Sequence, residues 1–175
     1  MLLTDQHHLV VRKRFRPIVD QYDVLAQPSG DPVAFAQKSR VSPEVTVYRD
    51  DGRRDAQFSV RARSEYAPIS GLAVTDRDGA AIGLVRAEQP WGRRVWYVER
   101  AGHAPVRGRE RSGVGAFFGA LFGWVPARFD FTAAGEPVFT VRRRFGPRRR
   151  FAVRIVDDGL DRRLAVALAV ALDVF

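Results

Sequence analysis

The sequence predicts a mainly β protein: a closed antiparallel β-barrel, built as a meander of hairpins, around a hydrophobic C-terminal helix. Three observations predict this fold. Short runs of alternating apolar and polar residues recur along the chain, and each is typical of a strand with one buried face. Polar turns that contain glycine separate these runs. An uninterrupted apolar run, 164–172, lies near the end of the chain.

Five successive hairpins follow from the order of the runs and turns. The paired runs are 22–25 and 33–35, 45–48 and 58–60, 72–74 and 82–85, 95–98 and a run near Val106, and 129–131 and 138–141, with turn glycines at 30, 52, 79, 102 and 135. Glycine supplies the positive φ that tight hairpin turns need. A β-sandwich with evenly spaced turns is the alternative. The closed barrel is favoured because closure leaves a long meander with the fewest unpaired edges.

The segment 113–126 interrupts this pattern, because it is rich in glycine and aromatic residues and carries no charge. Its glycines at spacing four resemble the small-residue motif of membrane helices, but the segment is too short to span a bilayer. Two interpretations stay open. A buried loop or short helix packed on the barrel is favoured. The alternative is contact with a membrane interface through Phe117, Phe118, Phe122 and Trp124.

The run 164–172 is predicted to be a helix over 161–173, because alanine and leucine favour helix and Asp158 or Asp161 offers an N-cap. Such a helix is apolar on every side, which is typical of a helix buried in a core or a membrane. Its length of about 20 Å is short for a bilayer and suits a small barrel. We therefore expect it to run through the middle of the barrel.

Composition narrows the class of protein. The 175 residues suffice for one domain, 1–175, and 46% of them are hydrophobic. The absence of cysteine excludes disulfides, thiolate metal sites and cysteine nucleophiles. The N-terminal residues lack the order of a signal peptide, and no run is long enough for a transmembrane span. We expect a soluble cytoplasmic protein, with association at the periphery of a membrane left open.

No signature of an enzyme or a cofactor site is present. The sequence has no nucleophile elbow, and neither lysine sits in a phosphate-binding loop. The pair His7 and His8 is interpreted as solvent-exposed rather than as a metal site. The paired carboxylates Asp50 and Asp51, like those near Asp76 and Asp157, are interpreted as turn formers. We therefore expect no catalysis, no metal and no cofactor.

The charge is unusual, and most of its excess is local. Lys and Arg number 29 against 20 Asp and Glu, which gives a net charge of +9, and only Lys13 and Lys38 are lysines. The first 87 residues hold 13 basic and 11 acidic side chains, and the rest hold 16 and 9. Six arginines flank a Gly-Pro turn, and the first strand adds further basic residues. The candidate anion-binding residues are Arg142, Arg143, Arg144, Arg148, Arg149, Arg150, Arg12, Lys13 and Arg14.

The order of these features resembles the tubby C-terminal-like superfamily, and in style the LURP-one-related proteins and their bacterial relatives, which are also similar to the phospholipid scramblases. The residues that carry the resemblance are the opening run 9–15, the glycine turn and strand 135–141, a further strand with a basic end at 142–145, and the terminal segment 161–168. The resemblance covers essentially the whole chain. It implies a twelve-stranded barrel around a central hydrophobic C-terminal helix.

The resemblance also implies functions. Tubby proteins bind phosphoinositides through Lys and Arg on the barrel, and scramblases act on membrane lipids. The chain departs from scramblases because it lacks a cluster of cysteines for palmitoylation, so scrambling is not carried over.

Three interpretations of the arginines stay open. The protein is a structural or protein-interaction module with a solvated basic surface. Alternatively, it binds anionic phospholipid headgroups at a membrane surface, because guanidinium groups bind phosphate oxygens in pairs. The least favoured interpretation is that it binds nucleic acid through the same arginines.

Overall fold

Twelve antiparallel strands close into a barrel in the computed structural model, which describes residues 2–16, 18–64, 70–88, 95–110, 127–144 and 149–174. Each strand pairs with its neighbours in the sequence, and the first strand closes the ring against the last. The strands are β1 (His8–Arg14), β2 (Gln21–Ala26), β3 (Pro32–Lys38), β4 (Glu44–Tyr48), β5 (Ala56–Ala62), β6 (Leu72–Asp76), β7 (Ala81–Glu88), β8 (Val95–Glu99), β9 (Val106–Glu110), β10 (Arg128–Ala133), β11 (Glu136–Arg144) and β12 (Arg150–Ile155). The predicted meander of hairpins is confirmed, and the sandwich alternative is wrong.

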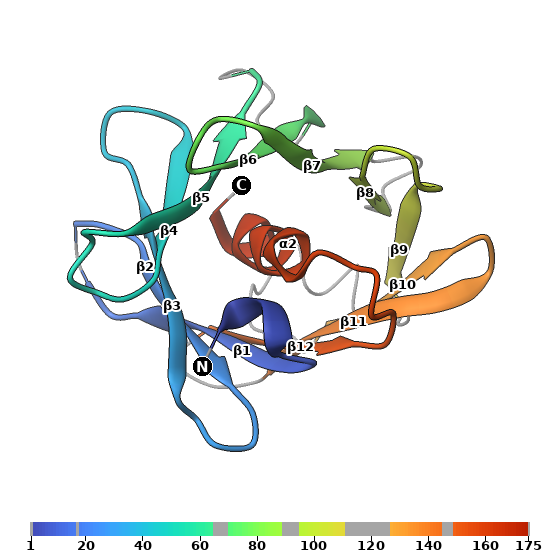
Figure 1. The fold of residues 1–175 in the computed structure, drawn as a ribbon, viewed down its shortest axis with the longest axis horizontal. Helices are drawn as coiled ribbons and strands as arrows, with labels where there is room; N and C mark the ends of the chain where they lie inside the picture. Colours follow the sequence, from blue (N-terminus) through green and yellow to red (C-terminus); the bar gives the residue numbers. More distant parts are fainter. Residues whose placement is uncertain are drawn as a thin grey trace.

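A single helix, α2 (Arg162–Val174), lies inside the ring of strands (Figure 1). Every residue from Leu164 to Ala171 is completely buried, as expected for a helix that is apolar all round. The Asp161 carboxylate accepts a hydrogen bond from the Arg163 backbone N–H at 2.9 Å and so caps the first turn. The predicted helix and one of its two predicted caps are confirmed. No helix in the described ranges is long and apolar enough to cross a bilayer.

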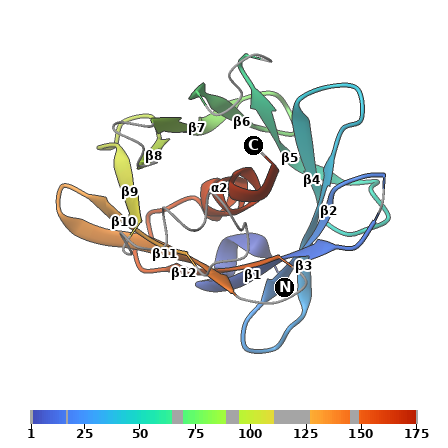
Figure 2. The ribbon, with the colours of Figure 1, turned by 180° about the vertical axis from the view of Figure 1, so that it is seen from behind.

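The interior is filled by the inward residues of the strands and by α2. At Gly83 of β7 an added Cβ would lie 2.9 Å from the Leu164 side chain and 2.4 Å from the Glu99 carbonyl oxygen. Glycine therefore lets the helix and the sheet approach closely at this point. A short 3-10 helix, η1 (Leu3–Asp5), lies against α2 at the end of the barrel where the helix begins (Figures 1 and 2).

Two local expectations differ from the structure. Residues 142–144 are not a further strand but continue β11, which is nine residues long, because no turn residue follows Val141 and the pairing with β12 runs on to Arg144. In the β4–β5 turn the positive φ falls on Arg53, at 58°, and not on Gly52. There the Asp50 carboxylate accepts a hydrogen bond from the Gly52 backbone N–H at 2.9 Å, so the side chain itself shapes the turn.

Candidate anion-binding groove

The strand alternation divides the predicted basic residues between two faces of the barrel wall. Arg142 and Arg144 on β11 share the outer face with Arg150 on β12 and with Arg12 and Arg14 on β1, opposite in direction to their buried neighbours. Lys13 and Arg149 turn instead toward the mouth of the barrel, where α2 ends, and Arg143 lies on the inward face of β11 with Val141. Arg148, Phe117, Phe118, Phe122 and Trp124 lie outside the described residues.

At the mouth of the barrel, the inward basic residues surround Asp173 near the end of α2. The Asp173 side chain is fully buried and lies 2.7 Å from Arg149 Nη1 and 3.1 Å from Lys13 Nζ. The Tyr22 hydroxyl donates a hydrogen bond to Asp173 at 2.7 Å. Burial alone raises the pKa of Asp173, but hydrogen bonds from Arg149, Tyr22 and Lys13 outweigh it, so the pKa lies below its ordinary value. These cations hold the end of α2.

Arg12 and Arg14 on the outer face are also bound within the protein. Both contact Asp23, at 2.9 Å and 2.6 Å, and Arg14 contacts Asp51 as well. Burial tends to raise the pKa of Asp23, but hydrogen bonds from Arg14 and Arg12 outweigh it and lower the pKa. Since Asp23 is 7% exposed, this carboxylate neutralises much of the charge that the two arginines add to the surface.

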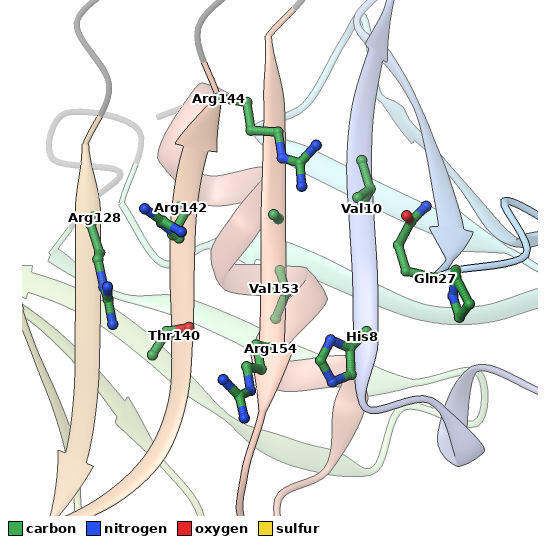
Figure 3. Close-up of a pocket in the computed structure, with 11 residues that line it drawn as sticks. His8, Val10, Gln27, Arg128, Thr140, Arg142, Arg144, Val153 and Arg154 are labelled. Carbon is green, nitrogen blue, oxygen red and sulfur yellow. The ribbon is translucent and has the colours of Figure 1, made fainter.

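Arg142 and Arg144, but not Arg150, line a groove of about 500 Å³ on the outer face of β10, β11, β12 and β1, hereafter the basic groove (Figure 3). Arg128 stands opposite Arg142 in the register of β10 and β11, and His8 stands opposite Arg154 in that of β1 and β12. Arg144 reaches from the end of β11 over the neighbouring strand (Figure 3). The residues that line the groove are His8, Val10, Gln27, Pro28, Arg128, Thr140, Arg142, Arg144, Ala152, Val153 and Arg154.

The side chains at the centre of the basic groove are small, so the surface is hollow there. Val10 and Ala152 are directly opposite each other in the β1–β12 register, and Ala152 is also opposite Arg142. Longer cationic side chains stand on both sides of this pair, and Thr140 adds a hydroxyl next to Arg154. The result is a shallow hollow with guanidinium groups around it, which is the arrangement that receives an anionic group with several oxygens.

Most of the positive charge in the basic groove has no ion-pair partner among the described residues. None of the described residues that line it is acidic. Arg128 has a carboxylate neighbour, Asp130, at 2.9 Å. For Arg142, Arg144 and Arg154 the described part of the chain contains no ion-pair partner, and all three are exposed. Clustered guanidinium groups of this kind produce a positive potential that attracts anions.

Sequence reasoning missed part of this site. Arg128 and Arg154 lie outside the arginine-dense segment, and His8 was interpreted only as half of a histidine pair. The two histidines diverge, since His7 Nδ1 lies 3.5 Å from Asp158 whereas His8 lines the basic groove. The one feature of the sequence that could have indicated these residues is the two-residue period of the strands, which places Arg128, Arg142 and Arg154 on the outer face. No group of His, Asp and Glu that could hold a metal occurs among the described residues.

The fold and groove define a class of protein: a twelve-stranded antiparallel barrel filled by its own C-terminal helix, with a cationic groove on its outer wall. A comparison with models of known protein families finds no match, and a comparison with curated proteins finds none either.

Proposed function

We propose that the protein is a non-enzymatic module that binds the phosphate groups of anionic phospholipid headgroups at a membrane surface through the basic groove. The observation that carries this proposal is the convergence of Arg142, Arg144 and Arg154 on one hollow, without an ion-pair partner in the described ranges. Arginines that only keep a protein soluble are normally interspersed with carboxylates, as Arg12 and Arg14 are with Asp23.

A headgroup fits the basic groove better than a nucleic acid does. Proteins that bind single strands combine basic residues with aromatic side chains on which bases stack. The described residues that line the groove include no Phe, Tyr or Trp, and their one aromatic ring is the imidazole of His8. Guanidinium groups around a small hollow suit a compact anion such as a phosphate monoester or diester.

We also propose that the chain is a tubby-like barrel related in architecture to the LURP-one-related proteins. What supports this proposal is the combination of twelve meandering strands with an enclosed C-terminal helix, together with the sequence features that carry the resemblance. The binding proposal does not depend on this relationship, because it rests on the residues of the groove.

The test is sedimentation of the protein with phospholipid vesicles, either neutral or containing an anionic phospholipid. The wild-type protein is expected to bind the anionic vesicles and not the neutral ones. Each basic residue near an anionic leaflet contributes about 1 kcal/mol, so the triple variant Arg142→Gln, Arg144→Gln, Arg154→Gln should bind roughly 100-fold more weakly. Equal binding to both vesicles, or no binding, contradicts the proposal.

A matched control separates the groove from general basicity. Arg54, Arg77 and Arg107 are exposed and lie outside the basic groove. Their replacement by glutamine lowers the net charge by the same amount. We expect this variant to keep nearly all of the affinity of the wild type. If both triple variants lose affinity equally, the protein has only a diffuse basic surface and the groove is not the site.

A further inference from the structure

Exposed apolar side chains gather at one end of the barrel. In the described residues five large hydrophobic side chains are exposed, and three of them lie in the β1–β2 and β3–β4 loops. Phe15 is 89% exposed, Ile18 73% and Val41 95%. Burying such side chains against a partner or a membrane is favourable, so three of them at one end of the barrel mark a candidate docking surface.

The two loops are neighbours on the same rim. In an antiparallel meander, the connections that follow odd-numbered strands all lie at one end of the barrel, so β1–β2 and β3–β4 share that end. The Lys38 backbone N–H at the end of β3 donates a hydrogen bond to the Asp20 carbonyl at 3.0 Å, so the two loops start from adjacent positions of paired strands. Asp173, near the end of α2, contacts Lys13 and Arg149 at this same end. We call it the α2-C end.

Charge distinguishes the α2-C end from the opposite one. Arg16 and Arg40 are exposed beside the apolar loop residues, and Arg144 brings the basic groove to this rim, because it pairs with Arg150 at the last position of the β11–β12 register. The opposite end carries many of the turn carboxylates, together with the exposed arginines Arg54 and Arg77; the carboxylates are Asp31, Asp50, Asp76, Asp78, Glu136, Asp157 and Asp158. The α2-C end therefore has the larger excess of positive charge, and an anionic surface would attract it more strongly than the other end.

We propose that the α2-C end docks on an anionic phospholipid bilayer, with Phe15, Ile18 and Val41 inserted at the level of the headgroups. This inference rests on the proposed function and adds an orientation to it. Aromatic and aliphatic side chains gain free energy at the membrane interface, and basic residues beside them pair with anionic headgroups. The α2-C end offers both, and docking places the Arg144 end of the basic groove near the headgroups.

The natural absence of cysteine allows a direct test. Single-cysteine variants Phe15→Cys, Val41→Cys and Val156→Cys are labelled with a fluorophore that shifts its emission in an apolar environment. Val156 is the control, because it is also exposed, at 48%, but lies at the opposite end. With anionic vesicles the labels at 15 and 41 should shift to the blue and be quenched by brominated lipid, and the label at 156 should not. Equal shifts at all three positions overturn the proposed orientation.

A second pair of variants tests the energetic role of the loops. Phe15→Ser with Ile18→Ser should weaken binding to anionic vesicles by at least tenfold. The matched pair Leu2→Ser with Val156→Ser removes exposed apolar side chains from the other end. It should change the affinity for anionic vesicles less than twofold. If anionic vesicles bind but the labels at 15 and 41 stay in water, the orientation is wrong and headgroup binding stands. If no vesicle binds, headgroup binding fails as well.

Discussion

Single residues decide how the ends of this barrel are joined to its core. Asp173 is the strongest case. Its fully buried carboxylate forms ion pairs with Arg149 and Lys13 and accepts a hydrogen bond from Tyr22. These three residues come from different segments of the chain. An intact buried cluster of this kind adds little to the free energy of unfolding. Loss of one partner lowers that free energy strongly, because the remaining charges are buried without compensation.

Replacing Asp173→Asn should therefore lower the free energy of unfolding by about 3 kcal/mol. The pKa of Asp173 is lowered in the folded protein, so its contribution is present above the unfolded pKa, about 3.9, and is lost as the pH falls through the folded pKa. Urea unfolding of the wild type and the variant, measured at a series of pH values from neutral to below about 4, checks this prediction. The stability of wild type and variant should converge in acid, and a constant difference at all pH values contradicts the assignment.

Gly108 sets the packing of the β9–β10 part of the wall. It is paired with Phe131, and an added Cβ would lie 2.2 Å from the Phe131 ring. The ring cannot move away freely because it is stacked on Phe139 with centroids 4.3 Å apart.

Gly108→Ala should therefore destabilise the protein by about 1–3 kcal/mol, as overpacking of a core does. In a Phe131→Leu background the same substitution should cost clearly less, because the smaller side chain can give way. A double-mutant cycle of urea unfolding measures the difference. If Gly108→Ala lowers the free energy of unfolding equally in both backgrounds, close packing against the Phe131 ring is not the reason for glycine at this position.

Among the elements, α2 is the one on which the barrel depends. Its central residue Leu168 is completely buried and belongs to the same hydrophobic core as the inward residues of the strands. Leu168→Ala should lower the free energy of unfolding by about 2–5 kcal/mol. Leu2→Ala is the control, since Leu2 is 56% exposed and its truncation should change stability by less than about 0.5 kcal/mol. Equal effects at both positions contradict a buried helix.

The elements were largely predictable from the sequence, and the site was not. The alternating runs and the terminal apolar run indicate strands and a buried helix without knowledge of the rest of the chain. The site depends on register, which the residues of one strand do not determine. Arg142, Arg143 and Arg144 look equivalent in the sequence, yet the period of two sends Arg143 inward. His8 and Arg154 meet only because β1 closes on β12.

At the scale of the whole molecule, the uneven charge predicts how binding responds to salt. Exposed charges are screened over about 8 Å at physiological ionic strength and over shorter distances in more salt. Raising NaCl from about 0.15 M to about 0.5 M should weaken binding to anionic vesicles by tenfold or more. Sedimentation at several salt concentrations measures this. Affinity that does not change with salt points to a purely apolar contact and excludes headgroup recognition by the basic groove.

The most direct test of the central claim follows the arginine side chains themselves. Nε–Hε resonances of the arginines are recorded by NMR while a short-chain anionic phospholipid is added below its micelle concentration. The basic groove predicts saturable shifts at Arg142, Arg144 and Arg154, with Arg54 and Arg77 unchanged. Uniform small shifts at all exposed arginines, or shifts confined to arginines outside the groove, contradict the claim that this groove binds anionic headgroups.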